Sequence, residues 1–430
     1  MTSPAPRRRA GLSPWSMVVG LGFVSLTIDM VSDGAISVSG ALLEELGASA
    51  VLVGTVTGTA TAIALVLRLV TGPWSDRSGS YWAFTIVGYA MSAVSVPLLA
   101  LTPVLGSASL AAASALLITE RTGKAVRGPA KTVLLADAAG AVGRGRGFGV
   151  HKLLDQIGAF AGPLVVAGVA GITGALWPAF LVLLIPAAVA MVLLFWLRAR
   201  VPDPSVYRPA TTPEVGGTPF EASADPARMS LAARLSGLAA IPGRVRTTFL
   251  LFAAFAAVTT FGLLSFGIVS YHLAATDLVP IAAVPLVYAA GMATAAVGAI
   301  LTGWAYDRLG TSVLLGVPLL TAFVPGLALG GTISMVVSGV LIWGLATGVQ
   351  DSTVKALVAD LVPVDQLGSA YGWFAVFQGL GALAGAVAAG ALYANLPVLV
   401  ALVAVTQVAA SVLLVLVLRR HRGRLPVSTA

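Results

Sequence analysis

The sequence contains no cysteine, only three histidines and few charged residues. Without cysteine there can be no disulfide and no thiolate metal site, and three scattered histidines argue against a histidine-rich metal site. Charged residues make up 10% of the 430 residues and hydrophobic residues 58%, whereas soluble domains carry about 25% charge. A soluble core cannot hide so much apolar surface, so the composition excludes a soluble enzyme and predicts that lipid surrounds most of the chain.

The residue patterns typical of enzymes are missing as well. No nucleophile triad, metal cluster or phosphate-binding loop is present, and the glycine-rich stretches lie inside apolar runs. We therefore expect no enzyme activity, no metal and no other cofactor. The net charge of +8 does not predict binding of nucleic acid, because the cations cluster in short loops between apolar runs.

Long apolar runs dominate what is present. A membrane-spanning helix needs about 20 mostly apolar residues, and the chain contains about twelve such runs. They lie near 15–38, 48–71, 82–104, 108–137, 148–172, 176–198, 246–272, 281–304, 312–332, 333–361, 368–394 and 396–418. We predict an all-α membrane protein with two homologous bundles of six helices each, 15–198 and 246–418. The rest of the chain forms a linker, 199–245, and two terminal tails, 1–14 and 419–430.

The positive charges predict the orientation in the membrane. Basic residues stand at every second boundary between spans, namely Arg7, Arg8, Arg9, Arg77, Arg144, Arg146, Arg308, Arg419, Arg420, Arg422 and Arg424. The alternate connections, such as those at Glu44, Glu45 and Asn395, contain no lysine or arginine. Because positively charged loops stay in the cytoplasm, both termini and the linker should be cytoplasmic, in a multi-pass protein of the cell (inner) membrane.

The two halves of the chain repeat one another. The first repeat pairs Gly72, Asp76, Arg77 and Gly79 with Gly303, Asp307, Arg308 and Gly310, and a second pairs Gly158 and Gly162 with Gly381 and Gly385. Two homologous hydrophobic halves are the plan of a secondary transporter, whose substrate site lies between them.

With these spans and the loop motif at 72–79, nearly the whole chain resembles the major facilitator superfamily. In that family the acidic residue of the loop pairs with helix N-termini and basic residues, and so latches the cytoplasmic gate in the outward-open state. The resemblance implies this role for Asp76 and Arg77 and for their copies in the second half. We expect Gly72 and Gly79 to permit a tight turn with unusual dihedral angles.

The fifth span carries Gly149, Gly158, Gly162 and Pro163. This spacing resembles the superfamily's antiporter signature, found in exporters that exchange substrate against protons, although the signature's final glycine pair is replaced. The second half keeps the glycines and lacks the proline. Small residues one turn apart also let two helices pack closely, so a pure packing role for the glycines stays open.

The fourth span contains Glu120, Arg121, Lys124, Arg127 and Lys131. All but Arg121 share one helical face, because they step by four, three and four residues. Each charge would cost several kcal/mol in contact with lipid, so this face should line a cavity. The stretch resembles a poorly characterised prokaryotic branch of the superfamily, which implies no particular substrate. A structural role for Lys131, near the cytoplasmic end, is the alternative.

Acidic residues on other spans can balance these cations. They are Asp29 and Asp33 on the first span, Asp155 on the fifth and Asp351, beside Lys355, on the tenth. The depth of a residue in the membrane can be counted from the cytoplasmic end of its span, at a rise of 1.5 Å per residue. By this count Asp29 lies level with Lys124, Asp33 with Glu120, and Asp155 with Lys131 and Arg127. These charges could form fixed ion pairs that switch partners. Alternatively, Asp29 or Asp33 takes up a proton, since like charges one turn apart favour protonation of one of them.

Together these features predict a monomeric, proton-coupled exporter of a small organic molecule or drug, working by alternating access among membrane lipids. An importer or uniporter of an anionic metabolite is one alternative, favoured by the cationic fourth span. A lipid flippase or membrane sensor with the same fold is another. Trp343, Trp373 and Phe377 could stack on a substrate, although packing is the commoner use of aromatic residues.

Overall fold

The computed structural model describes residues 11–207, 243–354, 357–358, 361–362 and 367–422, and every regular element in these ranges is helical. The first half contains α1 (Pro14–Ser37), α2 (Ser39–Glu45), α3 (Ala50–Val66), α4 (Arg68–Ser78), α5 (Tyr81–Leu98), α6 (Ser109–Val142), α7 (Arg144–Thr173), α8 (Trp177–Val182) and α9 (Leu184–Arg200), with short 3-10 segments at Leu99–Val104, Gly106–Ala108 and Pro204–Tyr207. The second half contains α11 (Gly243–Gly262), α12 (Phe266–Ala275), α13 (Val284–Leu309), α14 (Gly316–Ala328), α15 (Ile333–Val349), the π-helical segment η7 (Gln350–Val354), α17 (Leu367–Ala391) and α18 (Leu396–Arg422), with 3-10 segments at Ile281–Ala283 and Gly310–Leu315.

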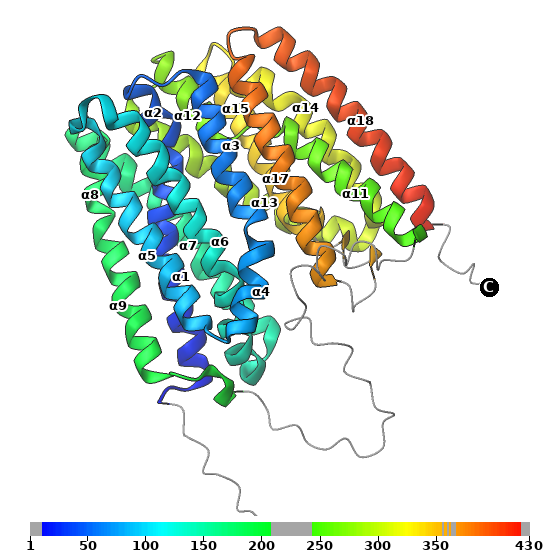
Figure 1. The fold of residues 1–430 in the computed structure, drawn as a ribbon. Helices are drawn as coiled ribbons and strands as arrows, with labels where there is room; N and C mark the ends of the chain where they lie inside the picture. Colours follow the sequence, from blue (N-terminus) through cyan, green and yellow to red (C-terminus); the bar gives the residue numbers. More distant parts are fainter. Residues whose placement is uncertain (1–10, 208–242, 355–356, 359–360, 363–366, 423–430) are drawn as a thin grey trace, which may run out of the picture.

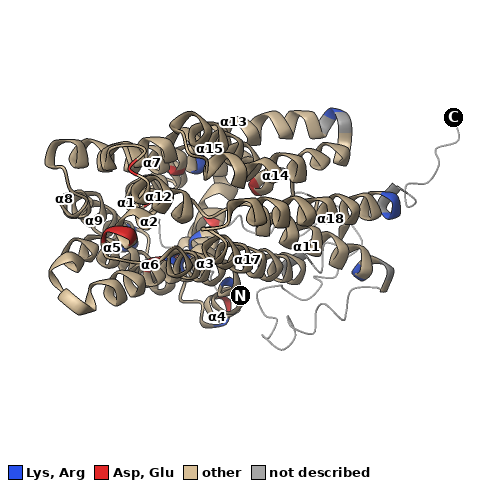
Figure 2. Ribbon diagram, turned by 90° about the horizontal axis from the view of Figure 1, so that it is seen from above, with Lys and Arg blue, Asp and Glu red and all other residues tan. Residues whose placement is uncertain are grey.

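Apolar side chains cover the outside of these helices as well as the inside. Val104, Ile172 and Ile300, for example, are 80%, 88% and 73% exposed on the surface. Figure 2 shows acidic and basic positions gathered between the two halves and at helix ends, while the outer helices are uncharged over most of their length. Exposed apolar surface of this kind needs lipid as its solvent, so the predicted all-α membrane fold is confirmed.

The predicted number of spans agrees with the structure once α6 is included. Eleven helical stretches in the described ranges are long and apolar enough to cross a membrane. The fourth predicted span, α6, is not among them because charged residues interrupt its 34 residues. It nevertheless packs against α3, α5 and α7 inside the first half. Most of the predicted linker, residues 208–242, lies outside the described ranges, as do residues 1–10 and 423–430 of the two tails.

The two halves lie side by side and use the same packing device (Figure 1). In the first half, a Cβ at Gly158 or Gly162 on α7 would run into backbone carbonyl oxygens of α1. In the second half, a Cβ at Gly381 or Gly385 on α17 would run into backbone carbonyl oxygens of α11. The repeated glycines therefore allow close backbone contact in both halves.

The repeated loop motif is mostly helical. Gly72 lies inside α4, and only Gly79, with φ of 62°, adopts the left-handed conformation. The second copy behaves alike, since Gly303 lies inside α13 and Gly310 has φ of 65°. The expected turn at Gly72 is therefore wrong, because one left-handed glycine after the last helical residue is enough to end the helix.

The halves are joined at the end of the molecule that carries α2 and α12 (Figure 1, top). A Cβ at Gly40 on α2 would run into the backbone of α12. Across the same junction, the backbone N–H of Ala41 donates to the hydroxyl of Ser270 at 2.9 Å, and the hydroxyls of Thr57 and Ser265 are 3.0 Å apart. This contact closes the space between the halves at one end.

Candidate functional site

A cavity of about 450 Å³ lies between the two halves. Near the joined end its wall is formed by buried residues such as Ser39 and Phe266, which are 5% and 3% exposed. At its other extreme it is lined by Lys152, whose side chain is 66% exposed. The cavity therefore reaches solvent away from α2 and α12, at the end where α1 begins and α9 ends.

Most of the charged residues predicted for the pathway line this cavity. They are Asp29, Asp33, Glu120, Arg121, Lys124, Asp155 and Asp351. Lys355 lies outside the described residues. Arg127 does not line the cavity but lies behind its wall, so the cationic face of α6 serves the cavity only in part.

Arg127 pairs with Asp29 inside the first half. Its guanidinium Nη2 lies 3.9 Å from Oδ1 of Asp29, and its side chain is 3% exposed. Nη1 donates to the hydroxyl of Ser92 at 2.5 Å, and the guanidinium stacks over the ring of Tyr89 at 4.9 Å. Asp29 was predicted to lie level with Lys124, so its ion-pair partner Arg127 is one helical turn away from the expected level.

Asp155 pairs with two lysines. Its carboxylate lies 3.8 Å from Nζ of Lys131 and 2.7 Å from Nζ of Lys152. The first of these contacts agrees with the depth count. Lys131 also donates to the hydroxyl of Ser25 at 3.0 Å, and Ser25 lies 3.1 Å from Nε2 of the buried His151. A continuous chain of polar groups thus leads from Asp155 into the first half.

The carboxyl groups of Asp29 and Asp155 are within hydrogen-bonding reach of each other. An ionised carboxylate only accepts hydrogen bonds, so two carboxyl groups can bond to one another only when one of them holds a proton. Two carboxyl groups this close together favour protonation of one of them.

Two more acidic groups are engaged close by. Glu120 is 3% exposed, accepts a hydrogen bond from the hydroxyl of Ser32 at 2.6 Å and pairs with Nε of Arg121 at 3.2 Å. Asp33 accepts a hydrogen bond from the hydroxyl of Tyr288 at 2.6 Å. Since Asp33 is on α1 and Tyr288 on α13, this bond connects the two halves.

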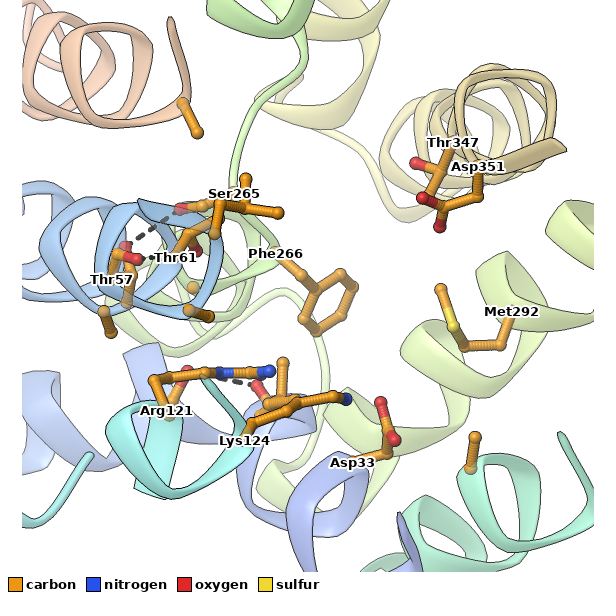
Figure 3. Close-up of a pocket in the computed structure, with 18 of the residues that line it drawn as sticks. Asp33, Thr57, Thr61, Arg121, Lys124, Ser265, Phe266, Met292, Thr347 and Asp351 are labelled. Carbon is orange, nitrogen blue, oxygen red and sulfur yellow. Dashed lines mark hydrogen bonds between the residues drawn. The ribbon is translucent and has the colours of Figure 1, made fainter. Parts of the chain in front are cut away.

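The second half contributes an aromatic and polar wall. Phe266 packs edge-on against Tyr288, with ring centroids 4.8 Å apart, and lies 5.8 Å from the ring of Trp343. Figure 3 shows Arg121 and Lys124 on one side of Phe266, with Thr347 and Asp351 across the cavity. Of the three aromatic residues proposed from the sequence, Trp343 lines the cavity, whereas Trp373 and Phe377 pack against a separate hydrophobic cluster.

Several residues of the site were not predicted from the sequence. Arg68, at the start of α4, lines the cavity. It could have been recognised from the sequence, because a charged residue inside the predicted span 48–71 is expected to face other protein groups or a cavity. Tyr288, Ser25 and His151 carried no such signal, because single polar residues in apolar spans are common and their partners lie far away in the sequence.

Among the described residues, those predicted for the loop motif and for the antiporter motif do not line the cavity. Arg77 is exposed at the end of α4, and Arg308 stacks on Trp304 with 3.8 Å between the guanidinium carbon and the ring centroid. The side chain of Asp307 is not among those described. Pro163 is buried inside α7, next to the two glycines that touch α1. Within the described ranges, no group of three histidine or acidic residues could hold a metal ion.

Comparison of the sequence with known families gives one clear match. The profile of the Major Facilitator Superfamily matches residues 19–350 and 250–429. Uncharacterised proteins of Mycobacterium bovis and Mycobacterium tuberculosis are 44% identical over 386 residues, which cover 90% of this chain and 88% of each relative.

Solved structures share the fold at low sequence identity. A variant of the nucleoside transporter NupG has a TM-score of 0.71 at 13% identity, covering 93% of this chain and 99% of that one. A bacterial homologue of the human lysosomal transporter Spinster, inward-facing and unoccupied, has a TM-score of 0.66 at 16% identity, with 97% of both chains covered. The peptide transporter POT, in complex with sulfate, has a TM-score of 0.67 at 15% identity, with 95% of both chains covered.

Proposed function

Because the chain belongs to the major facilitator superfamily, we propose that it is a proton-coupled secondary transporter that moves a small organic molecule by alternating access. The family and the fold indicate a transporter and not an enzyme. The observation that carries the coupling is the carboxyl pair of Asp29 and Asp155, which can hold one proton in the wall of a cavity between the two halves. A proton there changes the charge beside any molecule bound in the cavity.

Alternating access requires the joined end to open while the other end closes. In this structure α2 and α12 are in contact and the cavity reaches solvent at the opposite end. If the positively charged loops are cytoplasmic, this is the inward-facing state. We place the cytoplasmic latch at Asp76 and Arg77, with Asp307 and Arg308 as its copy, and expect it to engage when the halves rock together at that end.

Export in exchange for protons is the direction that the partial antiporter signature predicts. Gly158 and Gly162 pack α7 on α1 in the way that their counterparts pack α17 on α11, so these glycines support helix packing in both halves. The feature found only in the first half is Pro163, which is buried and removes a backbone hydrogen bond in the middle of α7.

Uptake of an anionic molecule together with protons is the second candidate. It is favoured by Lys124 and Arg68, which line the cavity and make no ion pair within the described ranges. Protonation of the carboxyl pair adds positive charge to the wall, and this favours an anion.

The proposal can be tested with purified protein in liposomes that enclose a pH-sensitive dye. A panel of solutes is added outside, and both solute movement and the change in internal pH are recorded. We expect solute and proton fluxes to be coupled in the wild type, in opposite directions for export and in the same direction for uptake.

Asp29→Asn and Asp155→Asn should each abolish the coupled proton flux, because either change removes the shared proton. Arg198→Gln, an exposed charge change on α9, is the matched control and should behave as the wild type. Normal proton coupling in both aspartate variants would contradict the proposed proton site.

A further inference from the structure

Two cations in the cavity make no salt bridge within the described residues. Lys124 and Arg68 both line the cavity, and in the described part of the chain neither forms an ion pair or a hydrogen bond. The other cavity cations are paired, Arg121 with Glu120 and Lys152 with Asp155. A cation that lines a cavity between membrane-spanning helices and makes no salt bridge is available to an anionic ligand.

The excess of positive charge is local and follows from how the groups are arranged. Glu120 lies within electrostatic reach of Arg121, Lys124 and Arg127 at once. Arg68 is repelled by Arg127 and Arg121 and attracted by Asp351. One carboxylate on this wall therefore faces several cations, and the repulsion among them is relieved by any further negative charge.

The same conclusion follows from the charges of the whole site. The basic residues in the cavity lining or paired with it are Arg68, Arg121, Lys124, Arg127, Lys131 and Lys152, and the acidic residues are Asp29, Asp33, Glu120, Asp155 and Asp351. With every carboxyl group ionised, these described residues carry one positive charge more than negative. When one proton is held between Asp29 and Asp155, the surplus rises to two.

On the side of the second half, the cavity wall combines apolar and polar side chains. Phe266 and Met292 line the same cavity, and Figure 3 shows Phe266 between Lys124 and the wall that carries Thr347. A volume of about 450 Å³ falls within the range of sites for small organic molecules, about 300–1,000 Å³. The site thus combines a free cation, an aromatic surface and room for a compact molecule.

We propose that the transported molecule is a compact, amphipathic organic anion. Its carboxylate, or a group of similar charge, binds Lys124, and its apolar body packs against Phe266 and Met292. Arg68 supplies a second positive charge that draws the anion into the cavity. This assignment rests on the proposed transport function and names the chemical class of its substrate.

A proton on the Asp29 and Asp155 pair removes one negative charge from the site, so anion and proton bind more tightly together than separately. Binding of the anion should therefore take up protons from solution.

The test uses the full-length protein in lipid nanodiscs and three probes of one shape, the carboxylate 2-naphthoate, the uncharged 2-naphthamide and the cation 2-naphthylmethylammonium. Binding is measured by isothermal titration, and proton uptake is obtained by repeating the titration in buffers with different ionisation enthalpies. We expect 2-naphthoate to bind at least tenfold more tightly than the other two probes, since a charge-assisted bond is lost in them. We also expect its binding to consume protons.

Variants separate a direct contact from a general charge effect. Lys124→Gln should weaken 2-naphthoate binding about tenfold or more, while Lys124→Arg, which keeps the charge, should retain most of it. Arg68→Gln should weaken binding less than Lys124→Gln, and Arg198→Gln, which removes an exposed charge on α9, should leave binding unchanged.

Equal affinity for the carboxylate and the amide, tighter binding of the ammonium probe, or no binding of any probe would each overturn the anion assignment. So would unchanged 2-naphthoate binding in Lys124→Gln. These results are separate from the test of transport, because a protein that selects the carboxylate but moves no protons in liposomes contradicts only the proton coupling. Proton-coupled movement of uncharged solutes alone contradicts only the anion assignment.

Discussion

Breaking the ion pair between Arg127 and Asp29 should destabilise the protein, and removing both charges should restore much of the loss. The two groups are 3.9 Å apart, and at an effective dielectric constant of about 20 their attraction is about 4 kcal/mol. Arg127 is 3% exposed, so water cannot replace a lost partner. Arg127→Gln removes the ion-pair partner of Asp29, and Asp29→Asn leaves the guanidinium with Ser92 and the ring of Tyr89.

We expect each single change to lower the free energy of unfolding by about 3 kcal/mol, the lower end of the range for breaking a buried pair. The double variant should lose less than the two single changes combined, with a coupling energy of about 0.5–3 kcal/mol. The measurement is reversible unfolding in mixed detergent micelles, followed by tryptophan fluorescence, for the wild type, both single variants and the double variant.

The exposed change Arg198→Gln is the control and should alter stability by no more than about 0.5 kcal/mol. Strictly additive losses would refute the reasoning, because they would mean that the two charges act independently. Single variants as stable as the wild type would refute it as well, since they would show that solvent or a neighbouring group compensates either charge.

Further predictions concern the gates and the coupling. Asp76→Asn should cut transport strongly with normal expression and membrane insertion, and Asp307→Asn should be milder; wild-type transport by the first variant would remove the latch assignment. Pro163→Ala should keep protein levels near normal but increase proton leak in liposomes, and an unchanged leak would leave the exporter interpretation without its main support. Tyr288→Phe removes the bond between the halves, worth about 1.5–3 kcal/mol to a charged acceptor, so thiol labelling of Ser39→Cys at the joined end should rise; unchanged labelling would argue against a clasp there.

The spans could be predicted from the sequence because lipid imposes a simple length rule. The charged fourth span could also be recognised, since a charge in an apolar run is rare and has to face other protein groups. For the same reason, the acidic residues on the first and fifth spans, and Asp351 on the tenth, indicated the interior of the protein before their partners were known. The length of an apolar run and a charge inside it can both be read from the local sequence alone.

The orientation of individual side chains could not be predicted in the same way. Lys124 and Arg127 are three residues apart and share one face of α6, yet Lys124 lines the cavity while Arg127 lies behind its wall. A modest rotation of the helix would exchange their roles. A span that is apolar on nearly all sides provides no periodic signal to set that rotation.

Contacts between the two halves could not be predicted from the sequence either. The bond from Tyr288 to Asp33 joins residues 255 positions apart, and it depends on how the two bundles dock. The sequence showed that Asp33 needs a partner but offered many hydroxyl groups on other spans. The interruption at Leu67, where α3 gives way to α4, likewise lies inside what reads as one continuous span.

The geometry of the site also relates the direction of transport to the charge of the substrate. If proton and substrate bind to the same site and exclude each other, the proton gradient drives export, as the partial antiporter signature suggests. If the substrate is an anion held by Lys124, a proton on Asp29 and Asp155 strengthens its binding, and by reciprocity the anion strengthens binding of the proton. Affinity for an anion should then rise as the pH falls, and the two should cross the membrane together. The sign of proton exchange on binding therefore decides between the two directions, because release of protons fits export and uptake of protons fits import.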